Sequence, residues 1–269
     1  MRIFIEAVGI AGPGLNGWRE ARAVLSGAAS HVHADTTIAP ILLLPPAERR
    51  RAGAVVRLAV GVGLDALAEA GRPAAEMATV FASSGSDGET IHQMLSVLTT
   101  DPRAMSPTRF HNSVHNAPSG YWAVATGSRE PSTSLCAFDD SFLAGLVDAT
   151  AQSITEARPV TLIAYDMPYP PPLHQSRPIV GAFAVALVLV ANDHARTIGC
   201  LDIGAPGNDR SDHPTPMSVP ALEHLRAGNP AARCLPLLAR MARGEAGHVL
   251  LDGAAGSTLD IHFSPRGTS

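Results

Sequence analysis

Short apolar runs alternate with segments of helical periodicity along most of the chain, and this alternation restricts its possible folds more than any other feature. Strand-like runs are expected at 2–10, 77–82, 132–137, 159–165 and 180–191. Helical patterns are expected at 17–27, 47–71, 89–99, 117–127 and 139–156. This order predicts an α/β protein with a mostly parallel five-stranded sheet covered by helices.

The last third of the sequence departs from the alternation. The runs 180–191 and 197–203 have no helix between them, which predicts an antiparallel hairpin. Residues 205–230 are rich in Gly, Pro, Asp and Asn and are interpreted as a linker or mobile loop. Residues 231–269 predict a C-terminal helix and strands that pack on the main domain, 1–204.

The composition excludes several classes of protein. The chain is 46% hydrophobic, enough for an ordinary core, and its formal net charge of -4 without a long basic run argues against a nucleic-acid partner. The N-terminal apolar stretch is too short to span a membrane and is interpreted as a buried strand. Cys136, Cys200 and Cys234 are odd in number and widely spaced, which favours a reducing, cytoplasmic location over disulfides or zinc.

Three segments carry a family resemblance. They are SPTRFHNSVHNAPSGYWAVATG at 106–127, STSLCAFDDSFLAGLVDA at 132–149 and GAFAVALVLVA at 181–191. They resemble the N-terminal half of β-ketoacyl synthases, most closely the short chain-length-factor-like proteins found beside synthases of aryl polyene and xanthomonadin-type pigment pathways. The resemblance implies a thiolase-like βαβαβαββ layer, with one thiolase half present.

Parts of the condensing machinery known in that family are not expected here. Decarboxylative condensation needs a thiolate nucleophile and donors that stabilise the developing enolate. Complete synthases carry two catalytic histidines in HGT-like and HxxG-like turns of their second half. The later histidines of this chain lack that context: His194, His213, His224, His248 and His262. The resemblance therefore implies a subunit that does not condense carbon units by itself.

The family's nucleophile turn lies in the second segment. The spacing of apolar residues in the following helix assigns Asp139 to the nucleophile position of the family. A carboxylate cannot form the acyl thioester that a cysteine nucleophile forms. Asp139 also suits a helix N-cap. Cys136, three residues earlier, is interpreted as a small buried strand residue, with a reactive thiol as the alternative. No catalytic residue is assigned.

The resemblance implies a heterodimer with a complete β-ketoacyl synthase, whose tunnel holds an acyl chain carried on acyl carrier protein. This subunit would close the far end of the tunnel. The residues expected at the interface or tunnel are Phe110, His111, Val114, His115, Asn116, Ser132, Thr133, Ser134, Leu135, Cys136 and Ala137. Two alternatives stay open: a stand-alone thiolase-like acyltransferase using Cys136 with a nearby His, and a non-catalytic carrier-protein-binding or structural homodimer.

Other motifs predict no metal or cofactor. His31, His33 and Asp35 form an HxH pattern without an evident third ligand, and are interpreted as a polar loop or edge strand. His111 and His115 are expected in a loop rather than as helical metal ligands. The glycines of SSGSDG at 83–88 match neither dinucleotide nor phosphate-loop spacing, so the segment predicts an ordinary turn between a strand and a helix.

Overall fold

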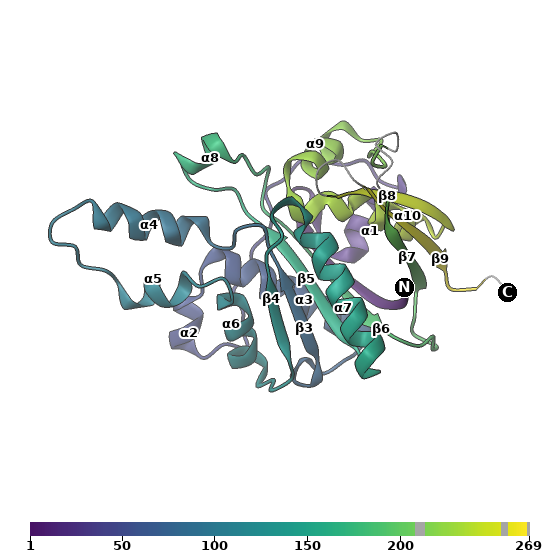
Figure 1. Ribbon diagram of the computed structural model, residues 1–269, viewed down its shortest axis with the longest axis horizontal. Coiled ribbons are helices and arrows are strands. Elements are labelled where there is room, and N and C mark those ends of the chain that lie inside the picture. The colour runs from purple at the N-terminus through teal and green to yellow at the C-terminus, as the bar shows by residue number, and fades with distance from the viewer. Residues whose placement is uncertain (208–212, 254–257, 268–269) are drawn as a thin grey trace.

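The protein is described by a computed structural model that covers residues 1–207, 213–253 and 258–267 (Figure 1). The strands are β1 Arg2–Gly12, β2 Leu15–Asn16, β3 Ala78–Ala82, β4 Ser132–Leu135, β5 Val160–Asp166, β6 Phe183–Val190, β7 Gly199–Gly207, β8 Gly247–Asp252 and β9 Thr258–Pro265. The α-helices are α1 Trp18–Ser26, α2 Pro46–Arg51, α3 Ala54–Ala70, α4 Gly88–Leu98, α5 Pro107–Asn112, α6 Ala117–Thr126, α7 Ser141–Glu156, α8 Leu173–Ser176, α9 Pro220–Gly228 and α10 Leu235–Arg243. Three short 3-10 helices are η1 Ala74–Glu76, η2 Phe138–Asp140 and η3 Pro230–Cys234.

The strands form one nine-stranded sheet in the order β4-β3-β5-β6-β1-β7-β9-β8, with β2 paired to β1. β4, β3 and β5 are parallel neighbours, and β6 runs antiparallel to both β5 and β1. Four of the five strands β4, β3, β5, β6 and β1 therefore point the same way. This confirms the expected thiolase-like layer, and the sheet is longer than five strands because β7, β9 and β8 extend it.

The expected hairpin between residues 180–191 and 197–203 is wrong. β6 and β7 lie on opposite sides of β1, and each pairs antiparallel with it. Phe4 of β1 lies in register with Val190 of β6 on one side and with Cys200 of β7 on the other. The periodicity of two runs reports that both are strands, but it carries no information about a third strand that inserts between them.

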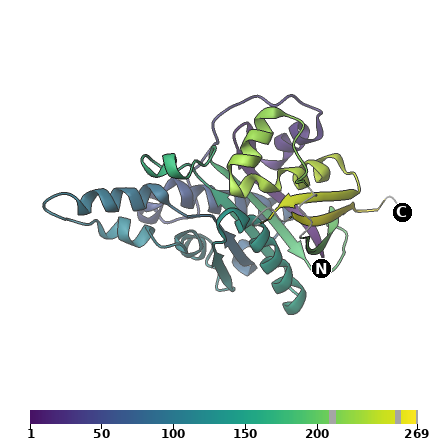
Figure 2. The same ribbon diagram turned by 45° about the horizontal axis from the view of Figure 1, so that its top comes forward.

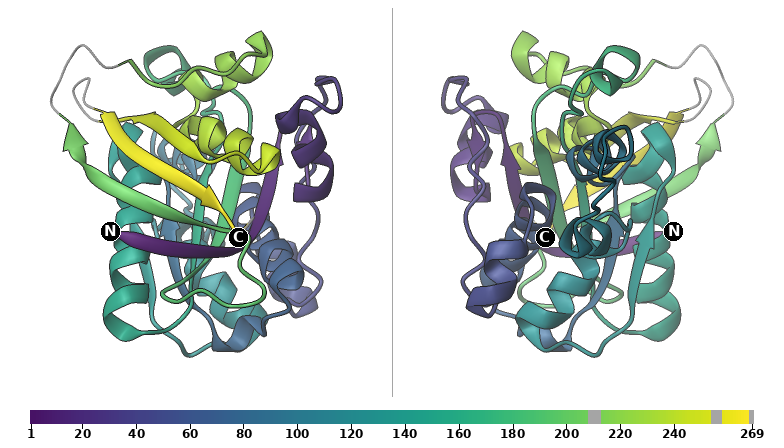
Figure 3. Two further views of the ribbon diagram at one scale, coloured as in Figure 1. Left: turned by 90° about the vertical axis from the view of Figure 1, so that its right-hand side faces the viewer. Right: turned by 90° about the vertical axis from the view of Figure 1, so that its left-hand side faces the viewer.

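Two hydrophobic layers cover the sheet. On one face, α3 and α6 pack around Phe81, Trp122 and Tyr165. On the other face, α7, α1 and α10 enclose the larger core, and Figure 3 shows the β8–β9 hairpin and α10 together at the end of the molecule that carries the C-terminus. α3 approaches β1 closely at Gly9, where a Cβ atom would lie 2.3 Å from the Val62 carbonyl oxygen. A glycine at this position therefore lets the layers meet.

Three expected segments differ from the structure. The helix expected at 47–71 is two helices, because Ala52 is extended and separates α2 from α3. The loop expected around His111 contains α5. The linker expected at 205–230 contains helix α9, which buries Leu222 and Leu225, so this part of it is neither linker nor mobile loop. Residues 208–212 of that linker lie outside the described residues.

Two features leave surface available for a partner. β4 is an end strand of the sheet, and helices α4 and α5 extend away from the body of the molecule as a projecting pair (Figures 1 and 2). The pair carries exposed apolar side chains at Ile91, Leu95, Leu98 and Phe110. In the described ranges, none of the helices combines the length and hydrophobicity that crossing a bilayer requires.

Candidate functional site

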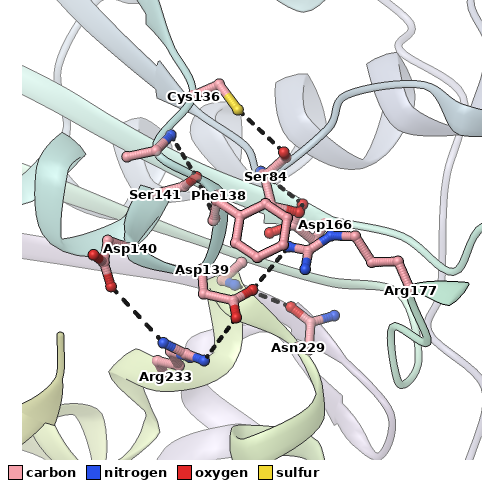
Figure 4. Close-up of polar contacts among 12 residues, drawn as sticks. Ser84, Cys136, Phe138, Asp139, Asp140, Ser141, Asp166, Arg177, Asn229 and Arg233 are labelled. Atoms are coloured by element: carbon pink, nitrogen blue, oxygen red, sulfur yellow. Dashed lines mark hydrogen bonds and ion pairs between the residues drawn. The ribbon is translucent and has the colours of Figure 1, made fainter. Parts of the chain in front are cut away.

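The turn that joins β4 to α7 is the centre of the candidate site (Figure 4). Phe138 adopts a left-handed backbone conformation there, with φ 52°. The buried Ser141 hydroxyl holds the turn, because it accepts a hydrogen bond from the Ala137 amide at 3.0 Å and donates one to the Phe138 carbonyl oxygen at 2.8 Å. The strand therefore reverses sharply before the helix begins.

Asp139 lies in this turn between two arginines. Arg177 donates to its Oδ1 at 2.8 Å, and the Arg233 Nη2 lies 3.3 Å from its Oδ2. The second Nη of Arg233 approaches Asp140 at 3.9 Å. The N-cap interpretation of Asp139 is wrong, since the capping position of α7 is Asp140 and the carboxylate of Asp139 bonds to side chains from distant segments.

Cys136 does not occupy the helix mouth. It follows the last residue of β4, and its Sγ donates to the Ser84 carbonyl oxygen at 3.1 Å. The side chain is exposed, so the expectation of a buried strand cysteine is wrong. No hydrogen bond between Cys136 and a histidine occurs among the residues that the structure covers. The His115 Nε2 lies 3.4 Å from a neighbouring carbonyl oxygen, that of Ser83.

A buried carboxyl group lies beneath this turn, at the end of β5. Asp166 Oδ1 accepts hydrogen bonds from the Ser84 amide, the Ser84 hydroxyl and the Ser83 hydroxyl at 2.9, 2.7 and 3.2 Å. Burial raises the pKa of Asp166 to about 6, although these hydrogen bonds and the charge of Arg177 act in the opposite direction. The sequence interpretation overlooked Asp166. An acidic residue directly after a buried apolar strand was the available signal.

We predict that Asp166 makes the stability of the fold depend on pH. Its pKa exceeds the ordinary value near 3.9, so the folded chain holds the proton more tightly than the unfolded chain. The free energy of unfolding should therefore fall as pH rises from about 4 to about 6, by on the order of 2 kcal/mol. Urea denaturation at several pH values should show that Asp166→Asn removes this component.

Asp101→Asn, a change on an exposed loop, is the matched control and should keep the pH profile of the natural chain. Equal pH dependence in Asp166→Asn and the natural chain would contradict the assignment.

The glycine-rich loop 83–88 is covered by the segment between β5 and β6, residues 167–182, which is called the strap. A Cβ atom at Gly85 would lie 1.8 Å from the Tyr169 hydroxyl oxygen, and one at Gly88 would lie 2.1 Å from the Tyr169 ring. Asp87 caps helix α4 by accepting from the Thr90 amide at 2.9 Å. These contacts agree with the expected turn between a strand and a helix.

A pocket of about 360 Å³ opens beside the turn. Phe138 and Asp139 contribute one wall, the strap residues Arg177 and Ile179 a second, and Arg233 a third. The pocket thus combines aromatic and aliphatic surface with one carboxylate held between two guanidinium groups. No side chain in this lining is a thiol or an imidazole.

The expected interface residues form two surfaces. Phe110 and His111 lie in α5 and are exposed, while Val114, His115 and Asn116 lie in the connection to α6. The second surface is the outer edge of β4 with the two residues after it. The residues of this edge are Ser132, Thr133, Ser134, Leu135, Cys136 and Ala137.

The histidine motifs are not brought together into a metal site. The His31 Nε2 lies 3.0 Å from the Pro13 carbonyl oxygen, and His111 stacks edge-on against Tyr121. Across the described segments, no group of three or more His, Cys, Asp or Glu side chains has the arrangement needed to hold a metal ion.

Comparisons with known proteins agree with this architecture. The family model "Beta-ketoacyl synthase, N-terminal domain" matches residues 18–234. No curated protein matches the chain significantly. Among solved structures, the ketosynthase ApeO in complex with its chain length factor ApeC from Xenorhabdus doucetiae matches with 23% identity and a TM-score of 0.73, covering 97% of this chain and 99% of that chain.

Two further structures match with the same TM-score of 0.73. The ishigamide ketosynthase/chain length factor is 13% identical and covers 99% of this chain and 100% of that chain. AntDE:AntF, a type II acyl-carrier protein in complex with its ketosynthase, is 12% identical and covers 98% of this chain and 99% of that chain. At these identities the likeness shows a shared fold.

Proposed function

Because this chain belongs to the β-ketoacyl synthase family, we propose that it is a non-condensing subunit of the chain-length-factor kind. It pairs with a complete ketosynthase that elongates an acyl chain on acyl carrier protein. The observation that carries the proposal is the β4–α7 turn, which holds Phe138 and Asp139 and no nucleophile at the mouth of the helix.

The chemistry of the turn supports this assignment. Condensation begins with a thiolate that attacks an acyl thioester, and neither a phenyl ring nor a carboxylate can form that intermediate. Asp139 is also held in place by Arg177 and Arg233, so its oxygens are engaged in ion pairs. The nearest thiol, Cys136, lies before the turn and bonds to a main-chain carbonyl oxygen. The site therefore suits a structural rather than a condensing role.

The pairing surface of the proposal is the outer edge of β4 with the adjoining helices. An unpaired strand edge presents free amide and carbonyl groups that a second chain can use to extend the sheet. Exposed apolar side chains flank it, with Val124 on α6 and Val147 and Ile154 on α7. Apolar surface beside an open strand edge is the combination that β-augmentation requires.

The resemblance to aryl polyene proteins leads us to include that pathway class in the proposal. The loop with Phe110, His111 and Val114 would border the partner's acyl tunnel, where side-chain bulk limits chain length because a packed wall yields little to another methylene. Free cysteines at positions 136, 200 and 234 fit a reducing, cytoplasmic setting.

Co-expression with a ketosynthase from the same genome tests the proposal. We expect a one-to-one complex by native mass spectrometry, and condensation of malonyl and acyl thioesters by the complex but not by the isolated chain. A lengthened ketone formed by the isolated chain would refute the non-condensing role. A chain that forms only homodimers in the presence of each candidate synthase would refute the heterodimer and favour the structural alternative.

The exposure of Cys136 favours one alternative enough to test it, an acyltransferase that uses this thiol. Incubation with an acyl N-acetylcysteamine thioester, followed by intact mass measurement, separates the two functions. The proposal predicts no acylation above that of Cys136→Ser. Rapid acylation that is lost in Cys136→Ser would favour the acyltransferase instead.

A further inference from the structure

Phe138 has a backbone conformation that an aromatic residue rarely adopts. Its φ of 52° brings Cβ close to the main chain, which is costly for any residue other than glycine. Phe138 is nevertheless 59% exposed as a residue, so burial in the core does not compensate the strain. Strained positions of this kind concentrate at functional turns.

Surrounding groups hold the Phe138 ring at the pocket. The Arg177 guanidinium carbon lies 3.5 Å from the ring centroid, and the same arginine donates to Asp139 (Figure 4). The Ser141 hydroxyl fixes the carbonyl oxygen of Phe138. The Phe138 ring and the Arg177 side chain therefore contact each other in the lining of the 360 Å³ pocket.

A sharp turn from a strand into a helix exposes the side chain of its strained residue over the start of the helix, which is the arrangement that enzymes use to present a nucleophile. In this chain the strained residue is Phe138 and not Asp139. We propose that Phe138 occupies the position of the missing nucleophile and that its ring, stacked with Arg177, closes the adjacent pocket to acyl thioesters. This inference rests on the proposed function and deepens it.

The consequence is that a thiol placed at position 138 should be activated by the existing surroundings. It would lie in the 3-10 turn η2, three residues before the 16-residue helix α7, whose N-terminal amides favour a negative charge. The Arg177 guanidinium would lie beside it. Both effects lower the pKa of a thiol. The neighbouring carboxylates of Asp139 and Asp140 act in the opposite direction, and Arg233, which lies within 4 Å of both, partly offsets their charge.

The test uses Phe138→Cys in a chain that also carries Cys136→Ser and Cys200→Ser. Alkylation by iodoacetamide is followed against pH by intact mass. We expect the introduced thiol to titrate at least one unit below the ordinary value near 8.5, and to react about tenfold faster at pH 7 than an ordinary thiol. Adding Arg177→Gln should move this titration back upward, a response that a merely structural role for Arg177 would not produce.

An acyl N-acetylcysteamine thioester provides a second readout. The introduced thiolate attacks the acyl carbon, the carbon–sulfur bond of the donor breaks, and N-acetylcysteamine leaves as a thiolate that takes a proton from water. We expect stoichiometric acylation of Phe138→Cys and none of Phe138→Ser. A titration at or above 8.5, or acylation of Asp139→Cys but not of Phe138→Cys, would overturn the assignment.

Phe138→Gly provides an independent test if the cysteine variant fails to fold, because glycine adopts the observed φ without strain. This variant should open the pocket and bind octanoyl-N-acetylcysteamine at least tenfold more tightly than the natural chain in calorimetry. Equal affinities would contradict the closing role of the ring. All these measurements use the isolated chain. A negative result would therefore contradict the role of Phe138 without bearing on the proposed heterodimer, and a chain that did not bind a ketosynthase could still be tested in this way.

Discussion

Ser134→Pro is expected to abolish complex formation with the proposed ketosynthase partner while the isolated subunit stays folded. The reason lies in the register of β4. The carbonyl oxygens of Pro131 and Leu135 accept hydrogen bonds from Thr79 and Ser83, so alternate residues of this strand face β3. Ser134 lies between them in the alternation, and its main-chain groups face the open edge of the sheet.

Proline at this position removes an outward amide donor and places a ring where the partner strand would lie, while the hydrogen bonds to β3 remain. An unmade buried hydrogen bond costs about 1–3 kcal/mol, and together with the steric conflict this predicts a loss of roughly a hundredfold or more in affinity. Isothermal titration of the two purified subunits measures it directly.

Ser134→Ala is the matched control, because it removes the hydroxyl that lies 3.2 Å from Ser119 and keeps the amide. It should bind the partner nearly as well as the natural chain. If Ser134→Pro bound with undiminished affinity and a native circular dichroism spectrum, pairing through β4 would be ruled out.

Arg72→Met should destabilise the fold by about 3 kcal/mol, because it leaves a buried carboxylate without its principal counter-ion. The Glu6 side chain in β1 is fully buried, and Arg72, two residues beyond the end of α3, binds both of its oxygens. Two further groups offer incomplete compensation: His194 lies 2.7 Å from the same carboxylate and is charged only when protonated, and the exposed Arg196 lies 3.7 Å away. For a chain of this size the loss corresponds to a fall in Tm of roughly 6–12 °C.

A second variant separates the buried pair from packing. Glu6→Met together with Arg72→Met removes both charges and should be more stable than Arg72→Met alone. Arg2→Met breaks the exposed pair with Asp202 and should leave Tm nearly unchanged, since exposed ion pairs contribute little. Calorimetry measures both Tm values. If Arg72→Met and Arg2→Met had the same Tm, the buried pair with Glu6 would contribute no more to stability than the exposed pair.

The local pattern of apolar residues was sufficient to predict most of the strands and long helices. The apolar runs that became β1, β3, β5 and β6 and the long helical patterns that became α3 and α7 overlap the expected ranges. The short helices α5 and α8 were missed because four to six residues provide too little periodicity to distinguish a helix from a turn. The break at Ala52 was missed for a related reason, since the residues on both sides favour helix.

The sequence by itself determined the class of fold and the family, because these follow from local periodicity and from motifs of contiguous residues. Only the tertiary structure decided that β1 separates β6 from β7, and that Arg177 and Arg233 meet at Asp139. It also identified Phe138 as the strained residue and Asp166 as a buried acid. These facts depend on contacts between segments far apart in the chain and on backbone geometry, neither of which a residue pattern encodes.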